Sequence, residues 1–437
     1  MIIWKSTNNL LAKKKMKIEN IHISNLKTIE EADIKLPRFY SAISGKNNSG
    51  KSSVFYAIRT LFEEHEYDPY DDEQRDPVKD YPVWKKDKGS EPKISVALDI
   101  WIYRDADAGI FRFIETFIDE RKTEQSILVT LEKTTECKKS LDQLSVRIDG
   151  SEIQDDFKAR EIHKKFQTSR AYIFHNSTAP GHPYYLNRSL FGFLGEVSED
   201  DRKKVNTAKS KMMAAYTAIA KKQKKEIEET LGRLEEKYQV GISVPTFEID
   251  RFPFSLTLAD KKVELPLADW GSGTQNRTRI FLALIRAKRI TEASSDSDKI
   301  TPFMLVEEPE CFLHPSAQAD FGAALRDLSE DFGVQVICTT HSPYLLSVEH
   351  PESNILLERR SFRGQELETK VIDTSGENWM EPFALSLGID NSAFQEWKGL
   401  LFKRSSQLLL VEGKTDQEYF DLLKSDSHGK NRLSFEG

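Results

Sequence analysis

The sequence predicts an α/β protein with a parallel β-sheet and a phosphate-binding loop at the end of one strand. The apolar segment FYSAIS (39–44) runs directly into the glycine loop GKNNSGKSS (45–53), after which apolar residues recur at helical spacing. Nearer the C-terminus, the strand-like segments FMLVEE (303–308) and VQVICTT (334–340) are separated by a helical segment at 315–330. This alternation is the order found in parallel βαβ units.

The part of the chain around and after the glycine loop predicts antiparallel strands. Residues 17–36 contain two short strand patterns around a turn. Apolar residues alternate in EPKISVALDIWIY (91–103), and the alternation returns in SILVTLEKT (126–134) and LSVRID (144–149). We therefore expect an antiparallel β lobe next to the parallel sheet.

The composition changes over residues 196–238, which are rich in Lys, Glu and Ala and contain no Pro. This favours one or two exposed helices, and we expect a mostly helical insertion over 156–240. Strand patterns return in FSLTLADKKVELPLAD (254–269), followed by a helix over 275–290.

Composition excludes several classes of protein. No segment approaches the ~20 apolar residues of a membrane helix, so no membrane partner is expected. The three cysteines lie far apart without a CxxC pair, which suggests neither a disulfide framework nor a zinc site and fits a reducing, cytoplasmic location. The net charge of -7 gives no general attraction to nucleic acid, so contact with DNA would need a local basic face.

The loop 45–53 is predicted to bind ATP by its phosphates. Gly45 and Gly50 allow backbone N–H groups to converge on an anion at a helix N-terminus. Lys51 would reach the β and γ phosphates, and the Ser52 hydroxyl would hold Mg²⁺. The strand before the loop and the helix after it favour this site over a plain Gly/Ser turn. The remaining candidate binding residues of the loop are Asn47, Asn48, Ser49 and Ser53.

Two adjacent acids at the end of segment 303–308 supply the groups that ATP hydrolysis needs. Glu307 would join the Mg²⁺ shell through water, and Glu308 would be the base for the attacking water. Neighbouring side chains of a strand point to opposite faces, so the two acids can share a site only where the strand ends, and Pro309 marks that end. His341 follows the next strand and would hydrogen-bond the γ phosphate or the attacking water.

A second anion-binding turn, GSGTQ, precedes the helix at 275–290, with Ser272, Gly273 and Gln275 as its candidate binding residues. Two phosphate-binding turns in one chain suggest a composite site, in which this turn of one subunit closes over the ATP held by another. A homodimer or higher oligomer is therefore expected.

Together, GKNNSGKSS, WGSGTQ, FMLVEEPECFLHP and TTHSP resemble an ATP-binding-cassette (ABC) type ATPase of the SMC/RecF sort, and most of all the overcoming-lysogenization-defect (OLD) family of ATP-dependent nucleases. The resemblance makes 45–53 the Walker A loop, 272–275 the signature turn, Glu307 and Glu308 the Walker B acids, and His341 the switch histidine. Transporters and SMC proteins usually carry Asp where Glu307 stands. The family's Q-loop glutamine is not evident, and Gln74 is a candidate match.

By the same resemblance, SSQLLLVEGKTDQEYFDLL (405–423) is the opening strand and helix of a Toprim nuclease domain. Glu412 would bind a catalytic Mg²⁺ or Mn²⁺ there, or act as acid/base. The further carboxylates of such a site do not follow before Gly437, and one strand and one helix bury too little apolar surface to fold alone. No nuclease activity is expected from this chain alone.

The leading hypothesis is the ATPase module of an OLD-type DNA endonuclease that gates DNA cleavage in prokaryotic anti-phage defence, with a second defence-system protein as a further partner. One alternative is an SMC/RecF-like DNA-repair ATPase. Such a protein would have long arms with a heptad repeat, and the insertion is too short to provide them. Another is an ATPase sensor or scaffold that controls a separate effector. The expected organisation is a disordered leader (1–15), the N-terminal part of the ATPase domain (16–155), a dimerising helical insertion (156–240), the C-terminal part of the ATPase domain (241–400) and a Toprim start (405–437).

Overall fold

The structure is a computed structural model that describes residues 14–62, 76–85, 92–118, 124–178, 199–231, 257–260, 263–292, 299–362, 365–376 and 378–388. The chain divides into two compact units, Met1–Leu387 and Gly388–Gly437, and every helix and strand named below lies in the first. Most of the expected leader, Gln74, Glu412 and the Toprim segment lie outside the described residues.

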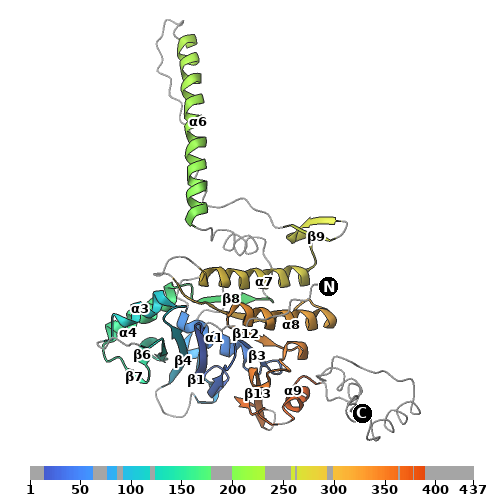
Figure 1. The fold of residues 1–437 in the computed structure, drawn as a ribbon. Helices are drawn as coiled ribbons and strands as arrows, with labels where there is room; N and C mark the ends of the chain where they lie inside the picture. The colour runs from blue at the N-terminus through green and yellow to red at the C-terminus, as the bar shows by residue number, and fades with distance from the viewer. Residues whose placement is uncertain are drawn as a thin grey trace, which may run out of the picture. The chain divides into compact units, whose positions relative to one another are not determined.

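A large mixed β-sheet forms the centre of the first unit, as the predicted α/β class requires (Figure 1). Its strand order is β7-β6-β5-β4-β1-β2-β14-β13-β3-β12-β11-β8. The antiparallel part is made of β1 (Lys17–Leu26), β2 (Ile29–Lys35), β4 (Lys93–Tyr103), β5 (Ser126–Glu136), β6 (Leu141–Ile148) and β7 (Ser151–Glu152). The other strands are β3 (Tyr40–Ser44), β8 (Tyr172–Asn176), β11 (Phe303–Glu307), β12 (Val336–Thr340), β13 (Asn354–Phe362) and β14 (Gln365–Ile372).

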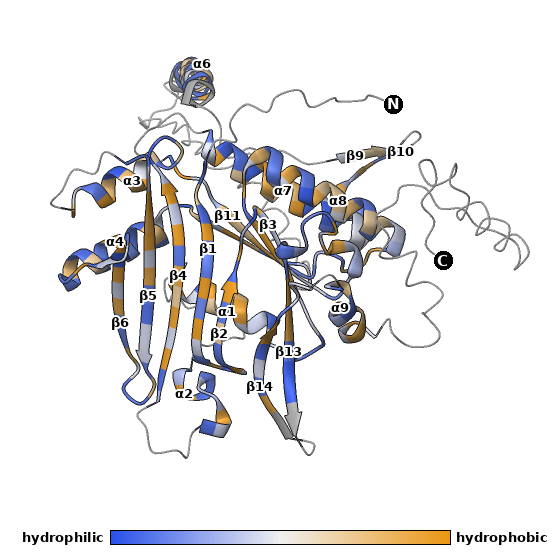
Figure 2. Cartoon of the chain, turned by 60° about the horizontal axis from the view of Figure 1, so that its bottom comes forward, coloured by the Kyte–Doolittle hydropathy of each residue, from blue (hydrophilic) through white to orange (hydrophobic). Residues whose placement is uncertain are grey.

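The strands that the sequence predicted pair as expected, and β8, β13 and β14, which it did not predict, join the same sheet. β13, β3, β12, β11 and β8 run parallel, and β3 and β12 are buried at every residue, which is typical of a parallel sheet covered on both faces. β4 instead alternates, and its inward residues at 94, 96, 98, 100 and 102 are at most 6% exposed. The antiparallel strands are continuous with the parallel ones in a single sheet, joined where β14 pairs with β2 (Figure 2).

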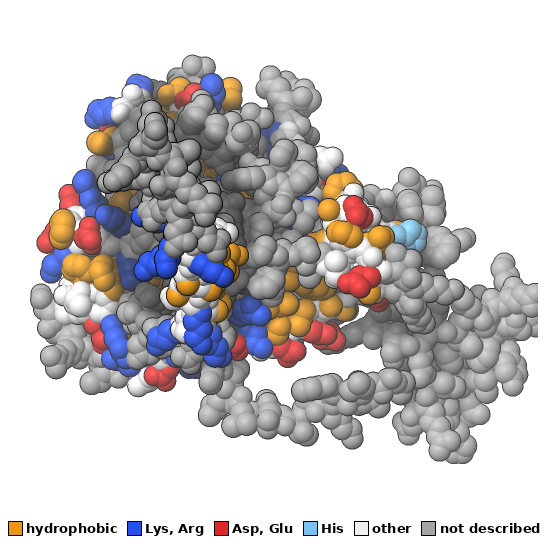
Figure 3. All heavy atoms as spheres, turned by 90° about the horizontal axis from the view of Figure 1, so that it is seen from above, with side chains coloured by type: hydrophobic (Ala, Val, Ile, Leu, Met, Phe, Trp, Pro, Cys, Tyr) orange, Lys and Arg blue, Asp and Glu red, His pale blue; other side chains and the backbone are white. Residues whose placement is uncertain are grey.

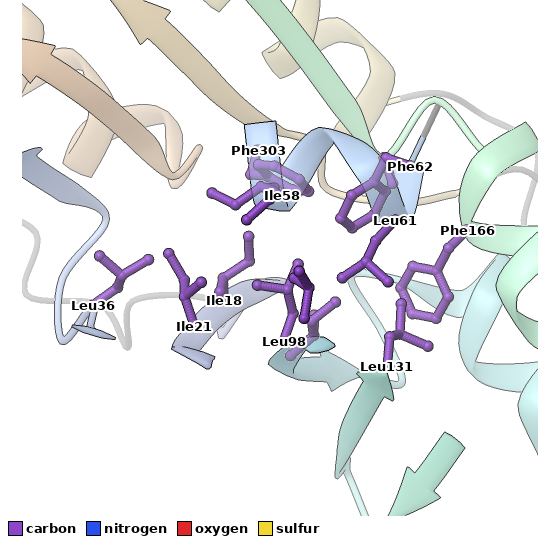
Figure 4. Close-up of a cluster of buried hydrophobic side chains, with 14 of the residues drawn as sticks. Ile18, Ile21, Leu36, Ile58, Leu61, Phe62, Leu98, Leu131, Phe166 and Phe303 are labelled. Atoms are coloured by element: carbon purple, nitrogen blue, oxygen red, sulfur yellow. The ribbon is translucent and has the colours of Figure 1, made fainter. Parts of the chain in front are cut away.

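Helices lie on both faces of the large sheet. α1 (Lys51–Phe62), α3 (Ala108–Glu115) and α4 (Asp156–Thr168) pack on one hydrophobic cluster, part of which is drawn in Figure 4. α7 (Ser272–Thr291), α8 (Pro315–Phe332) and α9 (Met380–Ser386) pack on another. Successive β11 residues alternate between the two clusters, with Leu305 in the first and Met304 and Val306 in the second, so the clusters lie on opposite faces of the sheet.

Outside the large sheet are α2 (Pro77–Asp80) and the hairpin of β9 (Thr257–Asp260) and β10 (Val263–Pro266), the latter as predicted. α6 (Glu199–Leu231) confirms a long helix in the Lys/Glu/Ala-rich segment. No described helix is long and apolar enough to cross a membrane.

The boundary expected at residue 156 is wrong for residues 156–176. α4 buries Ala159, Ile162 and Phe166 in the first cluster, and β8 joins the main sheet beside β11. These residues therefore belong to the sheet domain and not to an insertion. β8 has only five residues, which is too short a pattern to be recognised beside a helix. Its pairing partner, β11, also lies more than a hundred residues away in the chain.

Candidate functional site

Four neighbouring parallel strands end at one edge of the sheet. β3 ends at Ser44, β12 at Thr340, β11 at Glu307 and β8 at Asn176. Thr340 lies opposite Ser44, and Glu307 lies opposite Asn176, so the strand ends are level with one another. The glycine loop, the two acids and the histidine, each of which follows one of these strands, are therefore brought to the same edge, where open α/β sheets bind ligands.

The glycine loop is packed so closely that Gly45 and Gly50 cannot be replaced by larger residues without movement of their neighbours. A Cβ on Gly45 would lie 2.3 Å from the carbonyl oxygen of Leu357. Gly50 has a φ of +98°, and its Cβ would lie 2.9 Å from Oγ1 of Thr369 and 3.0 Å from Oγ1 of Thr28. Strands β13 and β14 and the β1–β2 turn thus hold the loop in a conformation that glycine adopts freely.

Lys51 begins α1 and is buried inside the loop. Its side chain is 6% exposed, and Nζ donates to the carbonyl oxygens of Gly45 (2.9 Å) and Lys46 (3.0 Å). Burial lowers the pKa of Lys51 to about 8, while the carboxylates of Glu308 and Glu310 act to raise it. The ammonium group therefore lies within the electrostatic reach of both acids.

The other candidate residues of the loop divide by exposure. Ser49 and Ser53 are buried, whereas Asn47, Asn48 and Ser52 are exposed at the start of α1. The first turn of α1 carries no acidic residue, so its N-terminal N–H groups and its positive dipole end are open to an anion in electrostatic terms.

Glu308 and His341 face one another across the strand ends. His341 Nε2 lies 3.7 Å from Glu308 Oε1, and the Cys311 thiol donates to Glu308 Oε2 at 3.4 Å. Burial and the Lys51 charge lower the pKa of His341, and Glu308 acts to raise it. Glu308 itself has a φ of +44°, which turns the chain sharply after β11 and gives the two adjacent acids different directions.

A third acid in this loop, Glu310, was not predicted from the sequence. Its Oε1 accepts hydrogen bonds from the backbone N–H of His341 (2.5 Å) and from Oγ1 of Thr340 (2.9 Å). The repeated acid in EEPE was the available signal, but the contact joins residues on two strands and could not be read from the segment itself.

The turn at 271–275 is joined to the loop that follows the two acids. Gly273 lies so close to it that a Cβ would be 2.4 Å from the carbonyl oxygen of Phe312. Gln275 Nε2 donates back to the carbonyl oxygens of Trp270 (2.6 Å) and Ala268 (3.0 Å), and Ser272 is exposed.

A buried amide next to this turn, also missed by sequence reasoning, makes a three-way connection. Asn276 is 4% exposed; its Nδ2 donates to the carbonyl oxygen of Pro309 (3.3 Å), and its Oδ1 pairs with Nε2 of His175 on β8 (2.9 Å). Burial lowers the pKa of His175, consistent with a neutral ring that donates to the amide oxygen. Asn276 thus ties α7, β8 and the loop after β11 together.

The oxygen-rich donors at the sheet edge fit a Mg²⁺ ion that arrives with a nucleotide. Ser52 offers a hydroxyl at the start of α1, and Glu307 offers a carboxylate at the end of β11. Among the described residues no group of three or more His, Cys, Asp or Glu side chains could hold a metal by itself. The ion would therefore depend on phosphate oxygens and water for its remaining ligands.

Comparisons with known proteins give one family match and one curated relative. Residues 16–346 match a family model described as an AAA ATPase domain. The Old nuclease of Escherichia phage P2 is 32% identical over 191 aligned residues, and the alignment covers 40% of this chain and 30% of that protein. The chain therefore matches less than a third of the length of this relative.

Solved structures with a similar chain path include SMC head domains. The SMC head bound to the C-winged helix domain of ScpA is 14% identical with a TM-score of 0.46, covering 83% of this chain and 99% of that one. The head domain with an extended coiled coil derived from Pyrococcus furiosus is 13% identical with a TM-score of 0.45, covering 85% and 99%.

Proposed function

Because the AAA ATPase domain model matches residues 16–346, the chain belongs to this family of ATPases, and on that premise we propose that it is the ATP-hydrolysing module of an OLD-type DNA endonuclease. The observation that carries the proposal is the meeting of Lys51, Glu308 and His341 at one edge of the parallel sheet. Phosphoryl transfer to water requires a cation that binds phosphate, a carboxylate and an imidazole within reach of one another.

In the proposed mechanism each group acts through its place at the sheet edge. The loop 45–53 and the N-terminus of α1 bind the phosphates, with Lys51 as the cation, and Ser52 and Glu307 would hold Mg²⁺. The bound ion would neutralise charge on the β and γ phosphates. Glu308 accepts a proton from the attacking water, and His341, 3.7 Å away, orients that water against the γ phosphate.

The signature turn is proposed to act on the ATP of a second copy of the chain. Ser272 is exposed, and Phe312 beside Gly273 is 66% exposed, so both side chains are accessible to a second copy of the chain. A homodimer that covers Phe312 would bring Ser272 and Gln275 over the partner's phosphates. α6 is proposed as a further dimer contact, since Met212, Tyr216 and Ile219 recur on it at helical spacing and are 38 to 52% exposed.

The nuclease part of the proposal rests on the relative, whose name is Old nuclease. We propose that ATP turnover gates cleavage of DNA by a Toprim site with Glu412 and Mg²⁺ or Mn²⁺, in anti-phage defence and together with a second protein of the same system. On the coloured part of the face seen in Figure 3, Lys and Arg side chains lie among acidic and apolar ones, so DNA bound on this face would be contacted by small groups of basic residues.

Phosphate release from ATP tests the ATPase site. Glu308→Gln keeps the size of the side chain but cannot accept the proton, so kcat should fall about 10² to 10⁴-fold while ATP stays bound. Lys51→Ala should lose ATP binding instead. The matched control is Glu349→Gln, an exposed acid away from the strand ends. Undiminished turnover in Glu308→Gln would remove Glu308 as the base.

Plasmid cleavage tests the nuclease part. The chain and the product of the complete gene are compared with Mg²⁺ or Mn²⁺, with and without ATP. Cleavage that depends on ATP and is lost in Glu412→Ala supports the gated nuclease. ATP hydrolysis without cleavage by either protein would leave the ATPase and overturn the nuclease, in favour of an ATPase that controls a separate effector.

A further inference from the structure

Glu310, in the loop between β11 and α8, has no part in the mechanism above, yet it makes the direct connection between the acid loop and the histidine. Its Oε1 receives the N–H of His341 at 2.5 Å and the hydroxyl of Thr340 at 2.9 Å. Both donors lie at the end of β12, where the chain turns toward the imidazole. One carboxylate oxygen therefore fixes the backbone of His341 from the neighbouring strand's loop.

The contact is part of a closed ring of hydrogen bonds. Thr340 Oγ1 accepts from the N–H of Ser342 (2.9 Å), and Ser342 Oγ donates to Oε1 of Gln318 on α8 (2.6 Å). Gln318 Nε2 donates in turn to the carbonyl oxygen of Leu313 (2.9 Å), three residues after Glu310. Such a ring holds the β11–α8 loop and the end of β12 as one unit.

The second oxygen of Glu310 is buried without a hydrogen-bond partner. A lone buried acceptor is costly, and natural proteins keep few of them. Burial raises the pKa of Glu310, and its hydrogen bonds to His341 and Thr340 oppose that rise. Glu310 in turn acts to raise the pKa of Lys51, so the carboxylate lies within electrostatic reach of the lysine as well as of the histidine segment.

The backbone on both sides of Glu310 is strained. Glu308 has a φ of +44° and Phe312 a φ of +65°, a region that side-chain-bearing residues enter at a cost. Such conformations persist where surrounding contacts hold them in place. Glu310 lies between these two residues, and its carboxylate supplies such a contact. Release of Glu310 would let the loop relax and carry Glu308 away from His341.

We propose that Glu310 is the positioning residue of this ATPase site, and that its carboxylate oxygen sets the separation of Glu308 from His341 by holding the His341 backbone. The inference rests on the proposed ATPase function and deepens it. It requires the hydrogen-bond acceptor at Oε1, so an amide in the same place should serve, whereas a shorter side chain or none should not.

Three substitutions with a matched control test this requirement. Glu310→Gln retains an oxygen that can accept both hydrogen bonds, Glu310→Asp keeps the charge but is one methylene shorter, and Glu310→Ala removes both features. Glu352→Ala is the control, because this glutamate is half-exposed and pairs with Arg38 away from the site. ATP hydrolysis gives kcat and KM, and hydrogen–deuterium exchange gives the protection of the His341 amide.

Loss of positioning should lower kcat on the order of 10²-fold in Glu310→Ala and Glu310→Asp, with KM little changed. Exchange at the His341 amide should become faster in the same two variants. Glu310→Gln should stay near the wild type in both measurements. Unchanged kcat and exchange in Glu310→Ala would overturn the inference, as would a Glu310→Gln variant as impaired as Glu310→Ala.

The exchange measurement separates this inference from the proposed function. If the wild-type chain hydrolyses no ATP, the proposed function fails, while the His341 amide still reports whether Glu310 holds it. A Glu310→Ala variant that loses nucleotide binding and thermal stability together would mark Glu310 as a general folding residue and overturn the positioning role.

Discussion

The imidazole of His163, on α4, should make the fold sensitive to acid. The side chain is 1% exposed, its Nε2–H donates to the carbonyl oxygen of Ser145 on β6 (3.1 Å), and its Nδ1 is buried without a partner. A second proton would place a positive charge in a site shielded from water, a cost that exceeds what the backbone carbonyls of Ser145 and Glu132 return. Burial, with Lys133 nearby, accordingly lowers the pKa of His163 from 6.5 to about 4.

The direction and size of the change in the free energy of unfolding follow from the difference between the pKa of His163 in the folded and unfolded chain. Above pH 6.5 the ring is neutral in the folded and unfolded chain, so stability does not depend on it. Between pH 6.5 and pH 4 the His163 ring becomes protonated in the unfolded chain but stays neutral in the folded chain. The free energy of unfolding therefore falls as the pH is lowered through this range. The loss is about 2 kcal/mol at pH 5 and about 3 kcal/mol once the pH is below 4, at about 1.4 kcal/mol per pH unit.

Urea unfolding followed by circular dichroism at pH 7.5 and pH 5 measures this loss. His163→Gln can still donate to Ser145 but cannot be protonated, so its fall in stability between the two pH values should be about 2 kcal/mol smaller than that of the wild type. Other titrating groups are shared and cancel in the comparison. An equal fall in His163→Gln and wild type would refute the reasoning.

Three further substitutions test other contacts. Gly273→Ala puts a Cβ 2.4 Å from the carbonyl oxygen of Phe312 and should lower kcat by up to about 100-fold. Gly271→Ala is the control, because its Cβ meets nothing within 4 Å, and it should leave kcat unchanged. Equal ATPase rates in the two variants would contradict the close packing at Gly273. Phe312→Ser should leave the free energy of unfolding within about 0.5 kcal/mol of the wild type, because the ring is 66% exposed. It should weaken ATP-dependent dimers at least about tenfold in analytical ultracentrifugation, and an unchanged dimer would exclude Phe312 from the interface. Asp107→Asn replaces one of two oxygens that each accept a backbone N–H in a fully buried site and should cost about 1 to 3 kcal/mol in urea unfolding; a smaller loss would show that the site rearranges.

Most strands and helices could be predicted because their signals are local. The period of two in β4 and the helical spacing of Val54, Phe55 and Ile58 in α1 follow from which face each residue buries. The pattern of segment 354–372 was not assigned to any element, although β13 and β14 lie there. β13 is buried over only part of its length and pairs with β3 from far along the chain, so its sequence carries a weaker signal.

The candidate site was predicted in its parts. The order of strand, glycine loop and helix, and the acids and histidine after two later strands, indicated which residues belong together, since the carboxyl ends of parallel strands share an edge. Glu310 and Asn276 could not be predicted in the same way. Each acts through a bond to residues on another strand or loop, and a short motif does not contain its distant partner.

The sequence by itself determined the α/β class, and it predicted the glycine loop and the neighbouring acids as parts of one site, because periodicity and glycine spacing act over a few residues. Only the tertiary structure decided that β8 belongs to the main sheet, that Glu308 Oε1 lies 3.7 Å from His341 Nε2, and that Glu310 holds the histidine backbone. Those contacts join segments 30 or more residues apart, and only the packing of the complete sheet and its helices brings them together.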